Sequence, residues 1–214
     1  VDSTHVEVVN FKEAMLRTAA DLFQPASRRM RDEDLAGAVA ALTTALRLAP
    51  DDVKLYLTRA AAYRLKGDLD TADAHFKKAA ELGNDPDILF GLAKITFERE
   101  KGKGKKADIN KVTEAISLAL EKKKKYPEVH EYIGKISLWN YLIDGAHNEY
   151  QQAETQYKAL RRPIPELLNF YDRTYKAFAT MDAPRRQRKQ AKKFAKEWKA
   201  KKQQYLVSLV TGQS

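Results

Sequence analysis

Residues 53–86 of this 214-residue chain read VKLYLTRAAAYRLKGDLDTADAHFKKAAELGNDP. In the second half of the segment, apolar residues recur three and four positions apart, at Leu69, Ala72, Phe76 and Ala79. An α-helix has about 3.6 residues per turn, so this spacing places the four side chains along one side of a helix. Gly67 precedes that helix and suits a tight turn. The segment therefore predicts two short helices joined by a turn.

Prolines on either side indicate that this helical hairpin is repeated. Proline ends a helix and is also favoured in the first turn of the next one. Four prolines lie 36, 41 and 36 residues apart, at Pro50, Pro86, Pro127 and Pro163. The chain has only 9 glycines and 7 prolines, and it lacks runs of alternating β-branched residues. These features predict an all-α fold of stacked helical hairpins.

Residues 53–86 resemble the tetratricopeptide repeat (TPR) family, whose 34-residue unit is a helix–turn–helix. The matching positions are Tyr56, Arg59, Ala60, Tyr63, Gly67, Ala72, Phe76 and Ala79. In such a unit Ala60 and Ala72 let the paired helices touch, while Tyr63 and Phe76 fill the space between them. The resemblance implies a right-handed superhelix of antiparallel hairpins, in which the first helices of the repeats line a concave groove.

The resemblance divides the chain into four parts. We expect a capping helix at 1–18, TPR-like repeats at 19–127, degenerate TPR-like hairpins at 128–181, and a basic amphipathic helix at 182–214. The third repeat carries a Lys- and Gly-rich loop insertion at 100–111. Pro25 falls inside the first predicted repeat helix, where we expect a kink or a fresh helix start.

Composition excludes several classes of protein. Hydrophobic residues make up 43% of the chain, which suffices for a packed core. Cysteine is absent, which excludes disulfides, thiolate nucleophiles and zinc fingers. No run of 18 apolar residues occurs, so no membrane-spanning helix is expected. We expect a cytoplasmic protein, with the nucleus as the alternative because Arg185–Lys189 reads as a basic import signal.

No motif nominates an active site. The four histidines, His5, His75, His130 and His147, never share the spacing that places two metal ligands on one helix face. The segment Lys101–Lys106 is rich in Lys and Gly but lacks the order of a phosphate-binding loop. We therefore expect a non-catalytic protein that has no metal site and no cofactor.

The TPR resemblance implies that a partner peptide or helix binds in the concave groove. The residues of this chain that correspond by position to the groove-facing residues of the TPR motif are Phe23, Arg31, Lys54, Leu57, Arg64, Ile95 and Arg99. Chaperone-binding TPR domains clamp a carboxylate with Lys, Asn and Arg side chains. The corresponding positions here hold Phe23, Ser27, Thr58, Ile88 and Leu92, so we expect no chaperone binding of that kind.

Positive charge is concentrated in the second half of the chain. The formal net charge is +10, made up of −3 over residues 1–100 and +13 over residues 101–214. Residues 185–202 contain ten Lys or Arg and one acid, Glu197. The predicted basic surface comprises Lys122, Lys123, Lys124, Lys125, Arg185, Arg186, Arg188, Lys189, Lys192, Lys193, Lys196 and Lys199. Such a one-sided excess favours an acidic partner.

The basic segment also carries apolar residues at helical spacing, at Ala191, Phe194, Ala195, Trp198, Tyr205, Leu206 and Leu209. This pattern fits either a terminal helix that caps the repeat array or an arm that projects to bind a partner. We predict a TPR scaffold or adaptor that mediates protein–protein interactions within a larger assembly, with the basic helix contacting an acidic partner, either an acidic protein tail or nucleic acid. The alternative is binding to the backbone of RNA or DNA.

Overall fold

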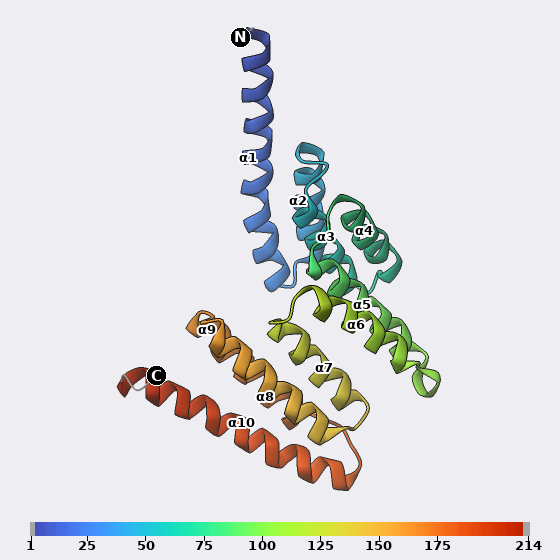
Figure 1. Cartoon of the computed structure of the whole chain (residues 1–214), viewed down its shortest axis with the longest axis vertical. Coiled ribbons are helices and arrows are strands. Elements are labelled where there is room, and N and C mark those ends of the chain that lie inside the picture. The colour runs from blue at the N-terminus through green and yellow to red at the C-terminus, as the bar shows by residue number, and fades with distance from the viewer. Residues whose placement is uncertain (1–2, 212–214) are drawn as a thin grey trace. The chain divides into compact units, whose positions relative to one another are not determined.

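The chain forms ten α-helices and one short 3-10 helix over the residues that the computed structural model describes, and that part contains no strand (Figure 1). The described residues are 3–211; for residues 3–7 and for Lys105 only the backbone is described. This architecture confirms the predicted all-α helical-repeat fold. The helices form two compact units, one ending at Lys123 and the other beginning at Lys124.

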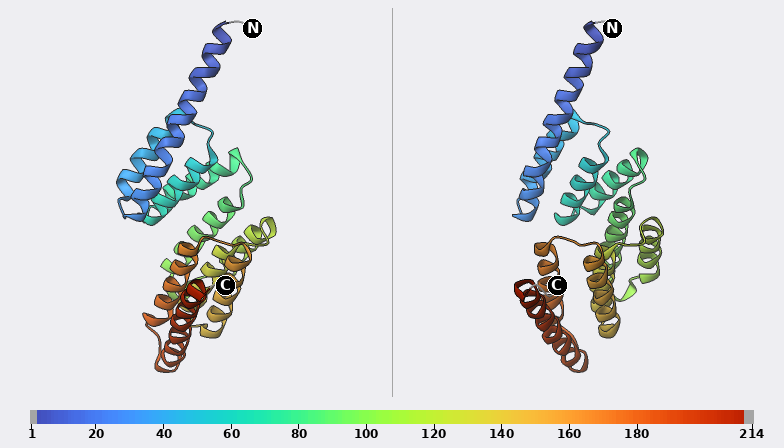
Figure 2. Two further views of the ribbon diagram at one scale, coloured as in Figure 1. Left: turned by 90° about the vertical axis from the view of Figure 1, so that its left-hand side faces the viewer. Right: turned by 60° about the vertical axis from the view of Figure 1, so that its left-hand side comes forward.

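The first unit contains three helical hairpins. Its helices are α1 (Ser3–Arg31), α2 (Leu35–Leu48), α3 (Val53–Leu65), α4 (Leu69–Leu82), α5 (Pro86–Gly102) and α6 (Ile109–Lys122). Helices α1 and α2, α3 and α4, and α5 and α6 pair as hairpins (Figure 2). Each hairpin packs on the next through α2 with α3 and α4 with α5. The two helices predicted from residues 53–86 are α3 and α4.

The second unit contains two further hairpins. Its helices are α7 (Pro127–Trp139), α8 (Ile143–Ala159), α9 (Ile164–Ala179) and α10 (Arg185–Thr211). Helices α7 and α8 form one hairpin, α9 and α10 form the other, and α8 packs against both α9 and α10. The basic segment therefore belongs to a packed hairpin.

Aspartate begins each of the five α-helices from α2 to α6. The caps are Asp34, Asp52, Asp68, Asp85 and Asp108, and each side chain accepts a hydrogen bond from a backbone N–H of the first turn. Such a cap typically contributes about 1 kcal/mol by satisfying a donor that the helix itself leaves unpaired. The short linkers between helices are thereby also the signals that start each new helix.

Three expectations about segment boundaries need correction. A separate capping helix at 1–18 is wrong, because α1 runs without interruption from Ser3 to Arg31 and passes through Pro25. A fresh helix start at Pro25 is wrong for the same reason. Ala19 and Ala26 of this helix are buried against the α2–α3 cluster, which holds it together despite the hydrogen bond that proline removes.

The segment 100–111 is also more ordered than a loop insertion. Helix α5 continues to Gly102, and the 3-10 helix Gly104–Lys106 follows. The buried carboxylate of Glu100 organises the turn, because it accepts hydrogen bonds from Lys103 Nζ and from the backbone N–H of Asp108 at 2.8 Å. Those two hydrogen bonds hold the pKa of Glu100 below its usual value, against the opposing effect of burial.

The turns after α3 and α7 adopt the same left-handed conformation with different residues. Gly67 has φ 84° and Tyr141 has φ 59°. In both turns the next backbone N–H bonds back to a carbonyl five residues earlier, from Asp68 to Tyr63 and from Leu142 to Ser137. Glycine adopts this conformation without steric cost, whereas tyrosine does not.

We therefore expect Tyr141→Gly to raise the free energy of unfolding by up to about 1 kcal/mol. The matched change is Gly67→Ala, whose added Cβ meets no atom within 4 Å and so tests the backbone alone. It should lower the free energy of unfolding by about 1 kcal/mol. Urea denaturation of both variants measures the two effects, and a loss of stability in Tyr141→Gly would contradict the left-handed turn.

Candidate interaction surfaces

The apolar side of α10 is buried against α8 and α9 as far as Trp198, and beyond it Tyr205, Leu206 and Leu209 are half-buried. Ala191, Phe194, Ala195 and Trp198 are buried in one cluster with residues of both helices, and Trp198 is completely buried. The indole Nε1–H of Trp198 donates to Nδ1 of His147 at 3.3 Å. The ring of Phe194 stacks on the same imidazole with centroids 3.9 Å apart. The basic helix is thus docked as a cap and does not project as an arm.

His147 is held in its neutral form at this contact. Burial lowers its pKa below the usual value, and Glu197 opposes that effect only in part. Because an indole N–H can only donate, Nδ1 must be the accepting nitrogen and the proton resides on Nε2, which lies 3.4 Å from Glu197. The imidazole therefore links α8 to α10 as a polar element inside an aromatic cluster.

A buried carboxylate fixes the far half of α10. Glu154 of α8 is 8% exposed and accepts hydrogen bonds from Tyr171 at 2.7 Å and from Lys158 and Lys201 at 2.8 Å each. Burial alone would raise the pKa of Glu154, but the three hydrogen bonds together hold it below its usual value. Lys202 likewise pairs with Asp172 at 2.7 Å. Lys201 and Lys202 therefore both have carboxylate partners within the unit, and Lys201 shares Glu154 with Lys158.

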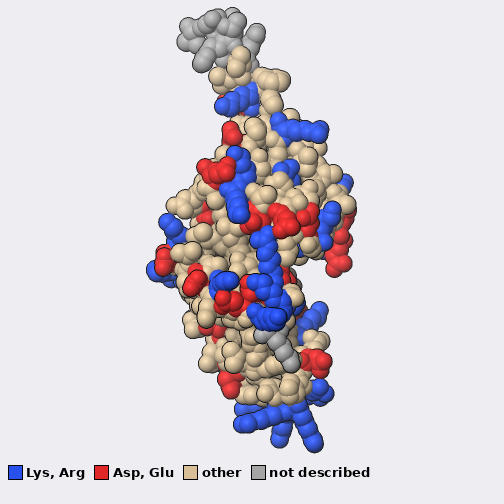
Figure 3. Space-filling model, turned by 90° about the vertical axis from the view of Figure 1, so that its right-hand side faces the viewer, with Lys and Arg blue, Asp and Glu red and all other residues tan. Residues whose placement is uncertain are grey.

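The remaining cations of α10 face water. Among the described residues, no carboxylate lies within ion-pair distance of seven of them, which we call the α10 basic face: Arg185, Arg186, Lys189, Lys192, Lys193, Lys196 and Lys199. All seven are exposed, and five of them also line one side of the helix at spacings of four and three residues. Arg188 differs, because it contacts Asp182 at 3.2 Å. Figure 3 shows basic side chains gathered at the bottom, where α10 begins.

The predicted lysine patch Lys122–Lys125 lies at the end of α6 and in the segment that leads to α7. Lys122, Lys124 and Lys125 are exposed. Lys123 is half-buried, and its Nζ lies 4.0 Å from a carboxylate oxygen of Asp87. Lys122–Lys125 therefore lie outside α10, which carries most of the predicted basic residues.

The predicted groove residues do not all line an open surface. Ile95 is 1% exposed and packs with Ala60, Ala72 and Phe76, so its assignment to a groove is corrected to the core between hairpins. Phe23 and Leu57 are half-buried against the core clusters. These side chains pack in the core that joins neighbouring helices. Their position in the repeat pattern does not reveal this packing.

The four predicted groove cations behave differently from one another. Arg31 and Lys54 are exposed, and Arg64 is half-buried. Arg99 bonds to Asp70 at 2.7 Å and also lies 3.5 Å from Asp73, so its charge is neutralised by α4. A partner in the groove therefore stays a prediction that rests mainly on Arg31 and Lys54.

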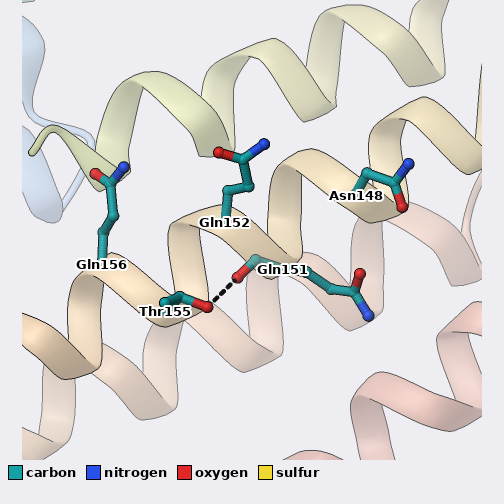
Figure 4. Close-up of a pocket in the computed structure, with 5 residues that line it drawn as sticks. All are labelled: Asn148, Gln151, Gln152, Thr155 and Gln156. Atoms are coloured by element: carbon teal, nitrogen blue, oxygen red, sulfur yellow. Dashed lines mark hydrogen bonds between the residues drawn. The ribbon is translucent and has the colours of Figure 1, made fainter. Parts of the chain in front are cut away.

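A polar pocket along α8 was not anticipated from the sequence. It is lined by Asn148, Gln151, Gln152, Thr155 and Gln156. In Figure 4 the side chains of Asn148, Gln152 and Gln156 point to the same side of α8, and the Thr155 hydroxyl donates to the carbonyl of Gln151 at 2.9 Å. Gln156 Oε1 is buried and accepts no hydrogen bond from any residue that the structure describes. The sequence did contain a signal for this pocket, because its uncharged polar residues recur at helical spacing on the side of α8 opposite the apolar residues.

The histidines occupy separate environments. His75 Nδ1 lies 3.3 Å from Arg59, His130 Nδ1 lies 2.8 Å from Glu149, and His147 is in the aromatic cluster of α10. The side chain of His5 lies outside the described residues. Among the side chains that are described, no three His, Asp or Glu residues gather as metal ligands would. No helix in the described part of the chain is both long and apolar enough to cross a membrane.

Comparison with known proteins finds similarity of structure alone. No protein family and no curated protein matches the sequence. The fold is similar to that of a MamA fragment (41-end) from Desulfovibrio magneticus RS-1, with a TM-score of 0.50, 14% identity, and coverage of 89% of this chain and 96% of that one. A crystal structure of MamA gives a TM-score of 0.49 at 17% identity, covering 86% of this chain and 96% of that one.

YrrB, described as a TPR protein with an unusual peptide-binding site, gives a TM-score of 0.45 at 17% identity, covering 95% of this chain and 98% of that one. At such identities the likeness is one of fold. The paired helices themselves confirm the predicted all-α helical-repeat architecture, and the MamA fragment with a TM-score of 0.50 shares that fold.

Proposed function

We propose that this chain is a non-catalytic scaffold that binds an acidic segment of a partner protein along the α10 basic face. The observation that carries the proposal is the division of charge on α10. Lys201 and Lys202 pair with Glu154 and Asp172, whereas no carboxylate of the described residues lies within ion-pair distance of the seven cations of the basic face. A surface that served only solubility would mix both signs.

The packing of α10 makes this face suitable for recognition. Trp198 and Phe194 anchor the helix, so the seven cations are presented on a rigid element. Each exposed ion pair contributes only about 0–1 kcal/mol, so affinity depends on several pairs forming together. The complex is therefore expected to weaken with salt, because exposed charges are screened beyond roughly 8 Å at physiological ionic strength.

The same packing bears on the nucleic-acid alternative. Binding of single strands commonly uses aromatic side chains on which bases stack. Phe194 and Trp198 are the aromatic residues within the basic segment, and both are buried against α8 and α9. They cannot stack on a base without undocking the helix. Binding to the phosphate backbone of a duplex would need only the cations and no base stacking. The experiment must therefore include a DNA duplex.

The test compares two triple variants with the same change in net charge. The first is Lys189→Glu, Lys192→Glu and Lys196→Glu on α10. The control is Lys12→Glu, Lys101→Glu and Lys106→Glu, three exposed lysines of the first unit. The probes are a 20-residue polyglutamate peptide and a 20-base-pair DNA duplex, titrated by fluorescence anisotropy at 50 and 150 mM salt.

We expect the α10 variant to bind polyglutamate at least tenfold more weakly than the wild type, while the control stays within about threefold. Equal losses in both variants would show that only net charge matters and would overturn the proposal. Tighter binding of the DNA duplex than of polyglutamate, lost in the α10 variant alone, would replace it with the nucleic-acid alternative.

A further inference from the structure

A second pocket in the unit formed by residues 124–214 has a different chemistry from the α10 basic face. It has a volume of about 420 Å³ and lies among the end of α8, the turn into α9, α9 itself and the last part of α10. Its lining includes Lys158, Arg161, Arg162, Leu167, Tyr205 and Ser208. Residues 50 positions apart in the sequence thus meet around one cavity, which is of the size that binds small ligands.

One of its three cations has no ion-pair partner in the part of the chain that the structure describes. Lys158 pairs with Glu154 at 2.8 Å, and Arg162 pairs with Glu128 at 2.8 Å and with Glu166 at 3.7 Å. For the guanidinium of Arg161 no ion pair or hydrogen bond is found with any described residue. Arg161 is therefore the cation of this lining that could pair with a negatively charged group of a ligand.

The backbone of Arg161 is unusual for an arginine. Its φ is 49°, the left-handed conformation that glycine normally occupies just after a helix. The neighbouring N–H of Arg162 bonds back to the carbonyl of Tyr157 at 3.2 Å, which completes a helix-ending turn. Because glycine fits this position, the guanidinium can be removed without disturbing the turn.

The rest of the lining supplies an apolar wall and further polar groups. Leu167 is 3% exposed, and the half-buried ring of Tyr205 packs against Tyr171 with centroids 5.9 Å apart. The hydroxyl of Ser208 donates to the carbonyl of Tyr205 at 2.8 Å. The Tyr205 hydroxyl makes no hydrogen bond to any described residue, so it is available to donate to a ligand.

We propose that this pocket binds a carboxylate attached to an apolar or aromatic body. Arg161 would pair with the carboxylate in the bidentate geometry that guanidinium groups favour, and the Tyr205 hydroxyl would donate to it. The apolar body would lie against Leu167 and the ring of Tyr205. One arginine available for pairing and an apolar wall favour a carboxylate over a phosphate dianion. The site is independent of the α10 basic face and adds a second binding activity to the chain.

The test uses the full chain and named probes. N-acetylphenylalanine supplies the carboxylate and the ring, and N-acetylphenylalanine amide is the same molecule without the charge. Two octapeptides ending in phenylalanine, one with a free carboxylate and one amidated, distinguish a polypeptide end from a free small acid. Binding is followed by NMR titration of the tyrosine ring resonances, with the Tyr205 signals assigned through Tyr205→Phe.

The decisive variant is Arg161→Gly, because glycine keeps the left-handed turn while removing the guanidinium. We expect it to bind N-acetylphenylalanine at least tenfold more weakly than the wild type and to unfold at the same or a higher urea concentration. Arg161→Lys keeps the charge without the bidentate geometry and should lose about threefold to tenfold. The amide probe should bind at least tenfold more weakly than the acid.

Equal binding of the acid and the amide, or unchanged binding of the acid by Arg161→Gly, would overturn the proposal. Arg161 could instead act only by offsetting the negative end of the α8 dipole. In that case Arg161→Gly would lower stability, and neither acid probe would shift the Tyr205 ring. These outcomes are separate from those of the polyglutamate titration, because neither probe set tests the other surface.

Discussion

Replacing Trp198 by alanine should destabilise the unit formed by residues 124–214 by about 3–5 kcal/mol, which is the usual cost of removing a large aromatic side chain from a core. Trp198 is completely buried and its ring contacts those of Tyr150, Phe170 and Tyr171. The change leaves a cavity between α8, α9 and α10. It also leaves Nδ1 of His147 without the donor that satisfies it.

Urea denaturation followed by circular dichroism measures this loss, and hydrogen exchange of the α10 amides shows whether the helix separates from α8 and α9. Lys199→Ala is the matched control, because Lys199 is the exposed neighbour on the same helix and should change stability by less than about 0.5 kcal/mol. A loss below about 1 kcal/mol for Trp198→Ala would contradict the docked position of α10.

Gly91→Ala should produce the second large effect, in the first unit. A Cβ added at Gly91 would lie 2.1 Å from Cε1 of Phe76, far inside van der Waals contact. Phe76 is 4% exposed and packed among Ala60, Ala72 and Ile95, so its ring has no free space into which it can move. Overpacking of this kind typically costs about 1–3 kcal/mol, and we expect the upper part of that range.

Gly102→Ala is the control, because it lies at the end of the same helix and its added Cβ meets no atom within 4 Å. It should be neutral or slightly stabilising, since alanine is a better helix former than glycine. The double variant Gly91→Ala with Phe76→Leu should recover part of the lost stability, because the smaller side chain relieves the collision. Additive losses would show that the two residues are not in contact.

Much of the fold could be predicted from local sequence patterns. The spacing of Leu69, Ala72, Phe76 and Ala79 predicted α4, and Gly67 was placed correctly at the turn before it. These features act through neighbouring residues, so they can be read without knowing which helices meet. Pro25 shows the limit of such local evidence, because packing of α1 holds the helix intact across a residue that usually ends one.

The candidate sites were predicted less well, because they depend on contacts between distant segments. Ile95 occupies a position typical of a groove residue but fills the space beside Phe76. The pocket around Arg161 joins α8, α9 and α10, and no spacing in the sequence connects Arg161 with Tyr205. The partner of an arginine or lysine decides whether its charge is available, and that partner is often far away in the chain.

The charge of residues 185–202 shows both what the sequence determines and what only the folded structure determines. Sequence alone established the hairpin architecture, the helical periodicity of this segment and its ten cations, because all three follow from residue identity and spacing. Only the folded unit separated those cations into two groups. Burial of Trp198 and Phe194 orients α10, and that orientation directs Lys201 and Lys202 toward Glu154 and Asp172 while the basic face remains in water. Charge is a property of the residue, but its availability to a partner is set by what packs beside it.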